Sequence, residues 1–174
     1  MIYLCEREIG FDAAQIGFPS VAGCRAIVLV TSGGLFGYHL NGNLNEGKKI
    51  AFAGFVNGNP LGLTKRALYV ASQGVGVPHY YGEIRALAAT LGYGGTIHWA
   101  NLGGPSAYAN FVNNHNNTCI ISWRTWSDPA DNVAANKGGY AAANRAIANG
   151  AAPAHMYTNL NAAGLTVVYP TVMP

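Results

Sequence analysis

The sequence predicts an α+β fold, a layered sandwich of mostly antiparallel β-sheets on which two or more helices pack. The prediction rests on many short apolar runs, on turns rich in Gly and Asn between them, and on two segments of helical character. No internal repeat or domain linker is visible, and 174 residues are enough to bury one core. We therefore expect residues 1–174 to form a single domain.

The strands follow from runs of β-branched and aromatic residues bounded by turn residues. The expected strands are residues 1–9, 26–30, 35–40, 50–56, 67–72, 96–100, 118–123 and 165–169. Residues 10–20 contain Gly10, Gly17 and Pro19, which favour a loop. The Asn- and Gly-rich segments 41–47 and 57–60 are expected to be turns on the same grounds.

Helical periodicity is clearest in residues 80–91. Apolar side chains recur there at steps of three and four residues, namely Tyr80, Ile84, Leu87, Ala88 and Leu91. Gly92 follows at the position where a left-handed helix cap is favoured. The Ala-rich residues 140–149, followed by Gly150, are expected to form a second helix.

The chain is organised around a predicted β-hairpin, in which residues 26–30 and 35–40 are the two strands. The small residues 31–34 supply the tight turn between them. With that turn Val30 faces Leu35, and the numbers of every opposed pair of residues add up to 65. The register then decides which side chains share a face.

This register brings a thiol and an imidazole onto one face, because side chains alternate along a strand and Cys24 and His39 fall on the same side. His39 lies opposite Ala26, one diagonal step from Cys24, with backbones roughly 7–8 Å apart. Gly23, directly before the cysteine, would let a substrate approach the backbone closely. A free cysteine and a histidine on an apolar face are also ordinary core residues, so a purely structural role stays open.

A short motif at this hairpin resembles known enzymes. The segment Val21-Ala22-Gly23-Cys24, followed by His39 in Phe36-Gly37-Tyr38-His39, is similar to the catalytic core of the cytotoxic-necrotizing-factor deamidases. It also resembles, less closely, the CheD-type chemoreceptor glutamine deamidases. Both families pair a Gly-Cys at the start of one strand with a His on the next. Ala22 stands where the toxin motif usually has Ser, so any role of that hydroxyl is absent here.

The resemblance implies a CheD/necrotizing-factor-like fold and a single catalytic domain over residues 1–174. The implied reaction is deamidation of a glutamine side chain in a protein, and some members of these families also transglutaminate. Cys24 would be the nucleophile, and His39 would hold its thiolate as an ion pair and protonate the leaving ammonia. Backbone N–H groups of Gly23 and Cys24 would stabilise the oxyanion, and no cofactor is needed. A third element, a backbone carbonyl or a Thr, has two candidate sources, Ser20 and the N-terminal strand.

The resemblance also implies a bacterial toxin or effector, secreted or translocated, that acts in the cytosol of a target cell. Its partner would be a substrate protein, such as a small GTPase or another host regulator. The cysteines agree with a reducing site of action, because Cys5, Cys24 and Cys119 are too few and odd in number for a disulfide framework. The oligomeric state cannot be inferred.

Composition argues against several other classes of function. Only 10% of the residues are charged, against the usual ~25%, and the net charge of +3 comes without a Lys/Arg cluster. We therefore expect neither nucleic-acid binding nor a basic membrane patch. No apolar run approaches the ~20 residues of a membrane span, and the first residues lack the pattern of a signal peptide. No His or Cys spacing is typical of a metal site.

Two alternative functions remain open. In the first, a non-enzymatic binding domain, the hairpin is plain core and Asn-rich loops and aromatic residues contact a partner. The tryptophans available for this are Trp99, Trp123 and Trp126. In the second, a papain-like cysteine hydrolase, Cys119 would pair with His155, and Asn159 or Asn161 would orient the histidine. That pairing is weaker because Cys119 opens an apolar run and no helix start precedes it to lower its pKa.

Overall fold

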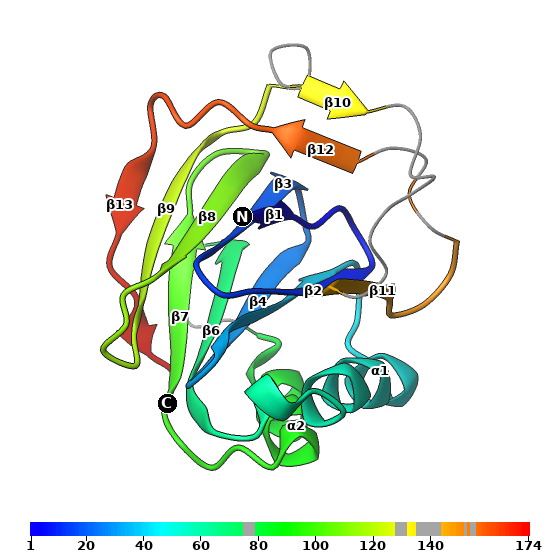
Figure 1. Ribbon diagram of the computed structural model, residues 1–174. Helices are drawn as coiled ribbons and strands as arrows, with labels where there is room; N and C mark the ends of the chain where they lie inside the picture. The colour runs from blue at the N-terminus through cyan, green and yellow to red at the C-terminus, as the bar shows by residue number, and fades with distance from the viewer. Residues whose placement is uncertain (75–78, 128–131, 135–143, 152, 154–155) are drawn as a thin grey trace.

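The computed structural model describes residues 1–74, 79–127, 132–134, 144–151, 153 and 156–174 (Figure 1). The strands in chain order are β1 (Ile2–Tyr3), β2 (Glu8–Asp12), β3 (Gln15–Val21), β4 (Arg25–Thr31), β5 (Gly34–Leu40), β6 (Lys65–Gln73), β7 (Ile97–Leu102), β8 (Ala107–Asn113), β9 (Cys119–Thr125), β10 (Asn132–Ala134), β11 (Arg145–Ile147), β12 (Met156–Asn159), β13 (Thr166–Val168) and β14 (Thr171–Val172). The helices are α1 (Glu46–Asn57) and α2 (Tyr81–Leu91), and a 3₁₀ turn, η1 (Pro60–Gly62), follows α1.

Most of the described strands belong to two large sheets. One sheet has the order β1-β3-β8-β9-β13, and the other has the order β11-β2-β5-β4-β6-β7-β14. The pairs β1–β3 and β6–β7 are parallel, which makes both sheets mixed, and the other described pairs are antiparallel. The predicted α+β class is thereby confirmed, with two helices in the described part of the chain.

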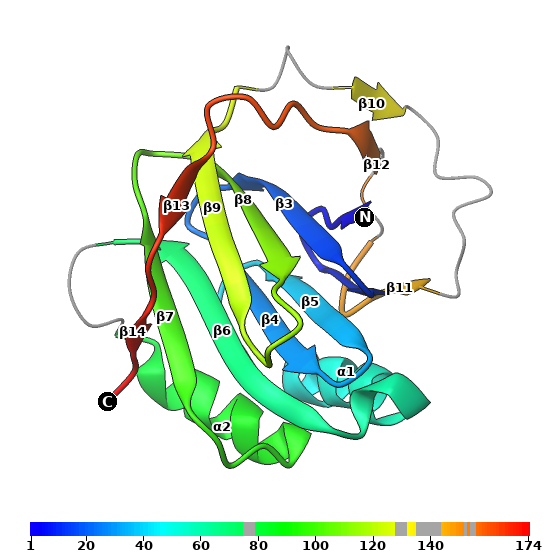
Figure 2. The ribbon, with the colours of Figure 1, turned by 60° about the vertical axis from the view of Figure 1, so that its left-hand side comes forward.

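The two large sheets and the helices stack in three layers (Figure 2). One buried cluster lies between the sheets and includes Phe18, Val28 and Phe111. A second cluster lies between the seven-stranded sheet and the helices and includes Ile27, Phe52 and Ile84. The seven-stranded sheet is therefore covered on both faces.

Strand β4 lies at the centre of this arrangement, and all of its residues are buried. Ala26, Val28 and Val30 belong to the cluster between the sheets, whereas Ile27 and Leu29 pack against the helix layer. A strand with both faces covered has a continuous apolar sequence rather than an alternating one. This explains why residues 26–30 are an unbroken apolar run.

The predicted hairpin register is confirmed, with Ala26 opposite His39. The turn is shorter than expected, because Thr31 also pairs with Gly34 and only residues 32–33 connect the strands. Gly34 has φ 144°, and a Cβ there would lie 2.7 Å from a neighbouring backbone carbon. Glycine is required at this position for both reasons.

The strand expected at residues 50–56 is wrong, because this segment lies within helix α1. The Asn45 side chain caps the helix by accepting a hydrogen bond from the Lys48 backbone N–H, and Glu46 lies in the first turn. The buried residues of α1 recur at helical steps: Lys48, Phe52, Ala53 and Val56. The capping residue and this period were the signals for a helix.

Several other elements match the prediction closely. Strands β6, β7, β9 and β13 lie where strands were expected, with ends shifted by one or two residues. Helix α2 is confirmed, and Gly92 ends it in a left-handed conformation with φ 69°.

Three further expectations are corrected by the structure. Residues 10–20 are not a loop, because they contain the end of β2 and all of β3, with Pro19 at an irregularity in the pairing with β8. Residues 1–9 form two strands in different sheets rather than one strand. In the expected helix 140–149, the described residues 145–147 form β11, because pairing with β2 overrides the helical preference of alanine; residues 140–143 lie outside the described part.

Candidate functional site

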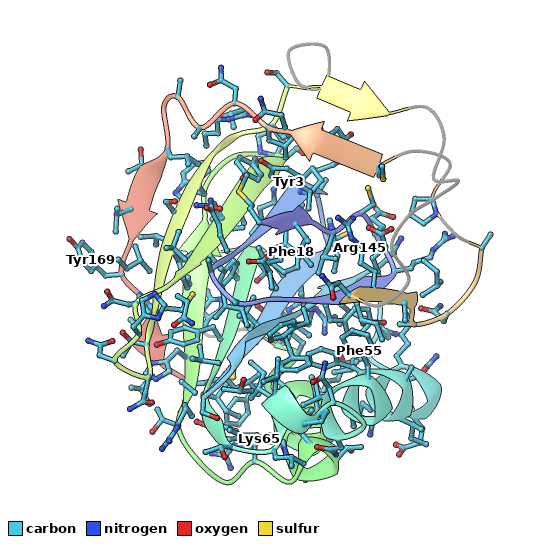
Figure 3. The ribbon with its side chains drawn as sticks, in the orientation of Figure 1. Tyr3, Phe18, Phe55, Lys65, Arg145 and Tyr169 are labelled. Atoms are coloured by element: carbon cyan, nitrogen blue, oxygen red, sulfur yellow. The ribbon has the colours of Figure 1, made fainter. Side chains whose placement is uncertain are left out.

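Cys24 and His39 lie on the same face of the β4–β5 hairpin, toward the five-stranded sheet. Cys24 directly precedes β4 and belongs to the buried cluster between the sheets. His39 lies in β5 opposite Ala26 of β4 and is fully buried. Its ring contacts the Phe18 ring edge-on, with 5.8 Å between the ring centroids. Phe18, labelled in Figure 3, projects from β3 into the interior. The structure thus places both residues as the register predicted.

The N-terminal segment passes directly beside His39 as it crosses from one sheet to the other. Residues 4–7 connect β1 in the five-stranded sheet to β2 in the seven-stranded sheet. On the way, the Leu4 carbonyl oxygen lies 2.8 Å from His39 Nδ1, and the Arg7 N–H donates to the His39 carbonyl at 2.8 Å. A carbonyl can only accept, so Nδ1 carries the ring proton and Nε2 is left with its lone pair.

His39 Nε2 has no hydrogen-bond partner among the described residues. Burial lowers the pKa of His39, although the bond to Leu4 and the charges of Glu6 and Glu8 act in the opposite direction. The ring is therefore neutral near pH 7 and presents an unoccupied basic nitrogen in the interior. An unpaired buried acceptor is costly to keep, which makes this atom a candidate for function.

The Cys24 thiol donates to Glu6 rather than to His39. Its Sγ lies 3.4 Å from Glu6 Oε1, and the residue is only 4% exposed. The pKa of Cys24 is raised to about 12, first by burial and then by the charge and hydrogen bond of Glu6, against smaller opposing effects of the Ala22 backbone and Arg25. The resting site thus holds a thiol, not a thiolate.

This charge state differs from the thiolate–imidazolium pair expected from the sequence. The pKa of Cys24 is raised and that of His39 is lowered, so both groups favour their neutral forms. The physical reason is burial, because separated charges cost more in a dry interior than in water. A reaction at this site must therefore move the thiol proton to His39 during attack rather than begin from a formed ion pair.

Gly23 has the conformation and exposure of a binding position. Its φ is 67°, and a Cβ there would meet no atom within 4 Å, so open space lies beside the backbone. The Gly23 N–H is occupied, however, because it donates to Gln73 Oε1 at 3.0 Å, while Gln73 Nε2 donates to the Val21 carbonyl at 2.6 Å. An oxyanion at Gly23 would have to replace the Gln73 oxygen.

Sequence reasoning did not name Leu4, Glu6 or Gln73 near the pair, although it offered the N-terminal strand, where Leu4 lies, as a source of a backbone carbonyl. The Asn41 side chain donates from Nδ2 to Glu6 Oε2 at 2.6 Å, so one carboxylate joins the thiol to the residue after β5. The hairpin register alone placed Asn41 on the Cys24 face. Glu6 and Leu4 gave no local signal, because their approach depends on how the N-terminal segment crosses between the sheets.

The other candidates from the sequence form no second site within the part of the chain that the structure describes, and the pairing of Cys119 with His155 stays a prediction. Cys119 is buried, which raises its pKa to about 12, and its proposed partner His155 lies outside the described residues. His98 is stacked on Tyr69 with 4.7 Å between ring centroids. Within the described residues, no group of three or more His, Cys, Asp or Glu side chains is arranged to hold a metal ion. Neither described helix has the length and hydropathy needed to cross a bilayer.

A cavity of about 570 Å³ lies away from the hairpin face, at the C-terminal end of α2. Its lining includes Arg85, Tyr93, Ile97 and Met173, and contains neither Cys24 nor His39. The reactive side chains of the hairpin and the cavity are therefore in different parts of the molecule. The hairpin is the better candidate site, because the cavity is open and its lining holds neither a cysteine nor a histidine.

No protein-family model matches the chain, and neither the curated proteins nor the solved structures contain a match to it. The likeness to the deamidases accordingly rests on the Gly-Cys and His residues quoted above. The function is argued below from the geometry around Cys24 and His39.

Proposed function

We propose that this protein is a cysteine-dependent glutamine deamidase with a CheD/necrotizing-factor-like fold, and that Cys24 and His39 carry out the reaction on a protein substrate. One observation carries the proposal. The hydrogen bond between His39 Nδ1 and the Leu4 carbonyl fixes the tautomer whose free Nε2 can accept a proton, on the face that holds the Cys24 thiol. A base oriented by a third group, with a nucleophile on the same face, is an arrangement that can activate a thiol once the two come within reach.

The reaction begins when the thiol leaves its hydrogen bond to Glu6 and gives its proton to His39 Nε2. Sulfur attacks the carboxamide carbon, and the resulting tetrahedral intermediate breaks its C–N bond as His39 returns the proton to nitrogen. Ammonia departs and a thioester on Cys24 remains. Water then attacks the thioester, His39 takes and returns a proton, and glutamate and the free thiol are formed.

The backbone around Gly23 provides the expected place for the oxyanion. The positive φ and the open space at Gly23 allow a carbonyl oxygen to approach, and the Ala22 backbone already hydrogen-bonds toward the sulfur. Gln73 occupies the Gly23 N–H in the resting state, so substrate binding exchanges one oxygen acceptor for another. The substrate would then be a host regulator such as a small GTPase, and the protein an effector acting in a target-cell cytosol.

The test uses glutamine-containing proteins of a eukaryotic cell extract as substrates. Wild-type protein should convert specific glutamines to glutamates, measured by mass spectrometry, and should release ammonia in equal amount. Added hydroxylamine should divert the thioester to a hydroxamate at the same glutamines. Cys24→Ser should do neither. Conversion that persists in Cys24→Ser would overturn the role of Cys24 as nucleophile, and absence of conversion by the wild type would overturn the proposal and favour a binding domain.

A further inference from the structure

Glu6 holds a fixed carboxylate against the proposed nucleophile. Oε1 accepts from the Cys24 thiol at 3.4 Å, and Oε2 accepts from Asn41 Nδ2 at 2.6 Å. The side chain is half-buried, so part of it is open to solvent. Each of its two oxygens therefore has a defined partner, and one of those partners is the reacting atom.

The position of this carboxylate is set by a well-anchored loop. The Asn41 and Asn43 carbonyls accept from the Lys48 ammonium at 2.6 and 2.8 Å. Arg25 donates to the Gly42 carbonyl at 3.2 Å and pairs with Glu83 at 2.6 Å. Asn41 is thus held by its backbone and in turn holds Glu6. Groups preorganised in this way are positioned before the substrate arrives.

We propose that Glu6 binds the leaving nitrogen of the carboxamide and selects an amide over an acid or an ester. This inference rests on the proposed function. When the thiol proton passes to His39, Oε1 loses its hydrogen-bond donor, and the NH₂ group of the substrate replaces it. The same oxygen then accepts from the ammonia formed as the C–N bond breaks, with the proton supplied by His39. Glu6 gains and loses no proton in these steps.

The charge of Glu6 also favours binding of the amide substrate over binding of the carboxylate product. A carboxylate attracts N–H donors and repels anions placed beside it. The glutamate product carries a carboxylate at the atom that Glu6 faces, so the product is repelled while the substrate is bound. A leaving group that departs as an anion is disfavoured for the same reason.

Glu8, two residues along, shows what a structural carboxylate looks like in this segment. It is completely buried, and its Oε2 accepts from the Cys5 N–H at 2.6 Å. Glu6 differs because it is half-exposed and its contact atom is the Cys24 sulfur. Its position matches a group that meets the substrate.

The test compares leaving groups of opposite character in wild type, Glu6→Gln and Glu46→Gln. Glu46 is an exposed carboxylate on α1 paired with Lys49, and removing it controls for the change in net charge. The probes are a blocked glutaminyl-glycine dipeptide, which releases ammonia, and p-nitrophenyl acetate, which releases an anion. We expect the ratio of kcat/KM for ammonia release to that for p-nitrophenolate release to fall about tenfold or more in Glu6→Gln. The ratio should stay within about twofold in Glu46→Gln.

A second measurement needs no turnover. Iodoacetamide carries a carboxamide and iodoacetate carries a carboxylate, so the ratio of their alkylation rates at Cys24 reports the selectivity of the site alone. Glu6→Gln should lower the preference for iodoacetamide by about tenfold, which is the size of effect expected for loss of one nearby charge.

An alkylation ratio that Glu6→Gln leaves unchanged would overturn the role of Glu6, whatever the activity. Parallel loss of both hydrolyses would overturn it as well and assign Glu6 to the structure. If ammonia release fails in the wild type while the alkylation ratio shifts as expected, the proposed deamidation is wrong and the amide-selective carboxylate stands. The two failures are therefore distinguishable.

Discussion

Cys24 and Cys119 are both buried in the cluster between the sheets, yet their surroundings differ. The pKa of each thiol is raised to about 12, and burial is the largest cause in both. At Cys119 burial is the cause that raises the pKa, and the thiol donates a hydrogen bond to the carbonyl of the adjacent Ile120 at 3.7 Å. At Cys24 the Glu6 carboxylate adds to burial, and the sulfur hydrogen-bonds to it.

The comparison shows that an unreactive resting thiol can have two origins. At Cys119 burial is what opposes ionisation, so we expect its thiol to stay protonated as long as it is buried. The Glu6 carboxylate beside Cys24 is half-exposed, and a substrate that satisfies Glu6 can release the thiol. The two cysteines should therefore respond differently to the same changes.

The largest difference should appear in activity. Cys24→Ser should lower the rate of ammonia release from glutamine by at least ~100-fold, because the hydroxyl is a far weaker nucleophile with the same base. Cys119→Ser should change that rate by less than about twofold. Both rates are measured on the substrates identified by mass spectrometry.

The free energy of unfolding of the two serine variants, Cys24→Ser and Cys119→Ser, is the control for this comparison of activities. Cys24→Ser is nearly isosteric, and the new hydroxyl can donate to Glu6, so the free energy of unfolding should change by less than about 1 kcal/mol. Urea unfolding of both variants measures it. An equal loss of activity in the Cys119 variant would remove the distinction between the two sites.

Two substitutions of His39 should separate its role as a base from its role in packing. His39→Ala removes the donor to the buried Leu4 carbonyl and leaves a cavity, which should lower the free energy of unfolding by about 3 kcal/mol. His39→Asn retains an N–H that can reach Leu4 and should lower it by only about 1 kcal/mol. Both lack a base and should lose ~100-fold or more in ammonia release.

Activity retained in the folded His39→Asn variant would show that Nε2 is not the base. The hydrogen bond to Leu4 would then explain His39 as a structural residue. Urea unfolding and ammonia release, measured on the same preparations, distinguish the two readings.

The hairpin was predictable because its register follows from alternation and a short turn. Ala26 faces His39 as predicted, and this alone placed Cys24 and His39 on one face. The charge state could not be predicted in the same way. It depends on Glu6 and Leu4, which approach through a crossing between sheets that no local pattern encodes.

The errors in secondary structure have a similar origin. Residues 50–56 are apolar enough for a strand, but the capping of α1 by Asn45 makes them helical. Residues 145–147 come from an Ala-rich stretch and are nevertheless a strand, because β2 offers an edge for pairing. Helix α2 and strand β6 were predicted correctly because their local sequence patterns agree with the way these elements pack and pair in the fold.

The pKa values of Cys24 and Cys119 should become different when the Glu6 carboxylate is removed. In Glu6→Gln the pH midpoint for alkylation of Cys24 should fall by about one unit, because the charge and hydrogen bond of Glu6 contribute to the raised pKa. The midpoint of Cys119 should stay where it is, since burial sets it. Below its midpoint the alkylation rate follows the thiolate fraction, so at a given pH between about 8 and 11 the rate with iodoacetamide should rise about tenfold for Cys24 and stay unchanged for Cys119. Equal shifts would indicate a general loosening of the core.

The smallest expected effect concerns acid stability, and it again compares the surroundings of the two cysteines. Burial lowers the pKa of His39 beside the Cys24 site, and also that of His98, which stacks on Tyr69 near Cys119 but is only half-buried. A histidine with a lowered pKa stays neutral in the folded protein, while the unfolded chain binds a proton below about pH 6.5. Stability is therefore complete above that pH and falls as the pH decreases.

For one histidine this slope reaches at most about 1.4 kcal/mol per pH unit between the unfolded and folded pKa values. Substituting His39 by Asn should remove more of the slope between about pH 5 and 6.5 than His98→Asn does, because His39 is fully buried. Carboxylates such as Asp12 and Glu83, whose pKa values are lowered, contribute equally to both variants and cancel in the comparison. Urea unfolding at several pH values measures the slopes. An unchanged slope in His39→Asn would mean that the ring gains a proton in the folded protein, and the neutral base on which the mechanism depends would be lost.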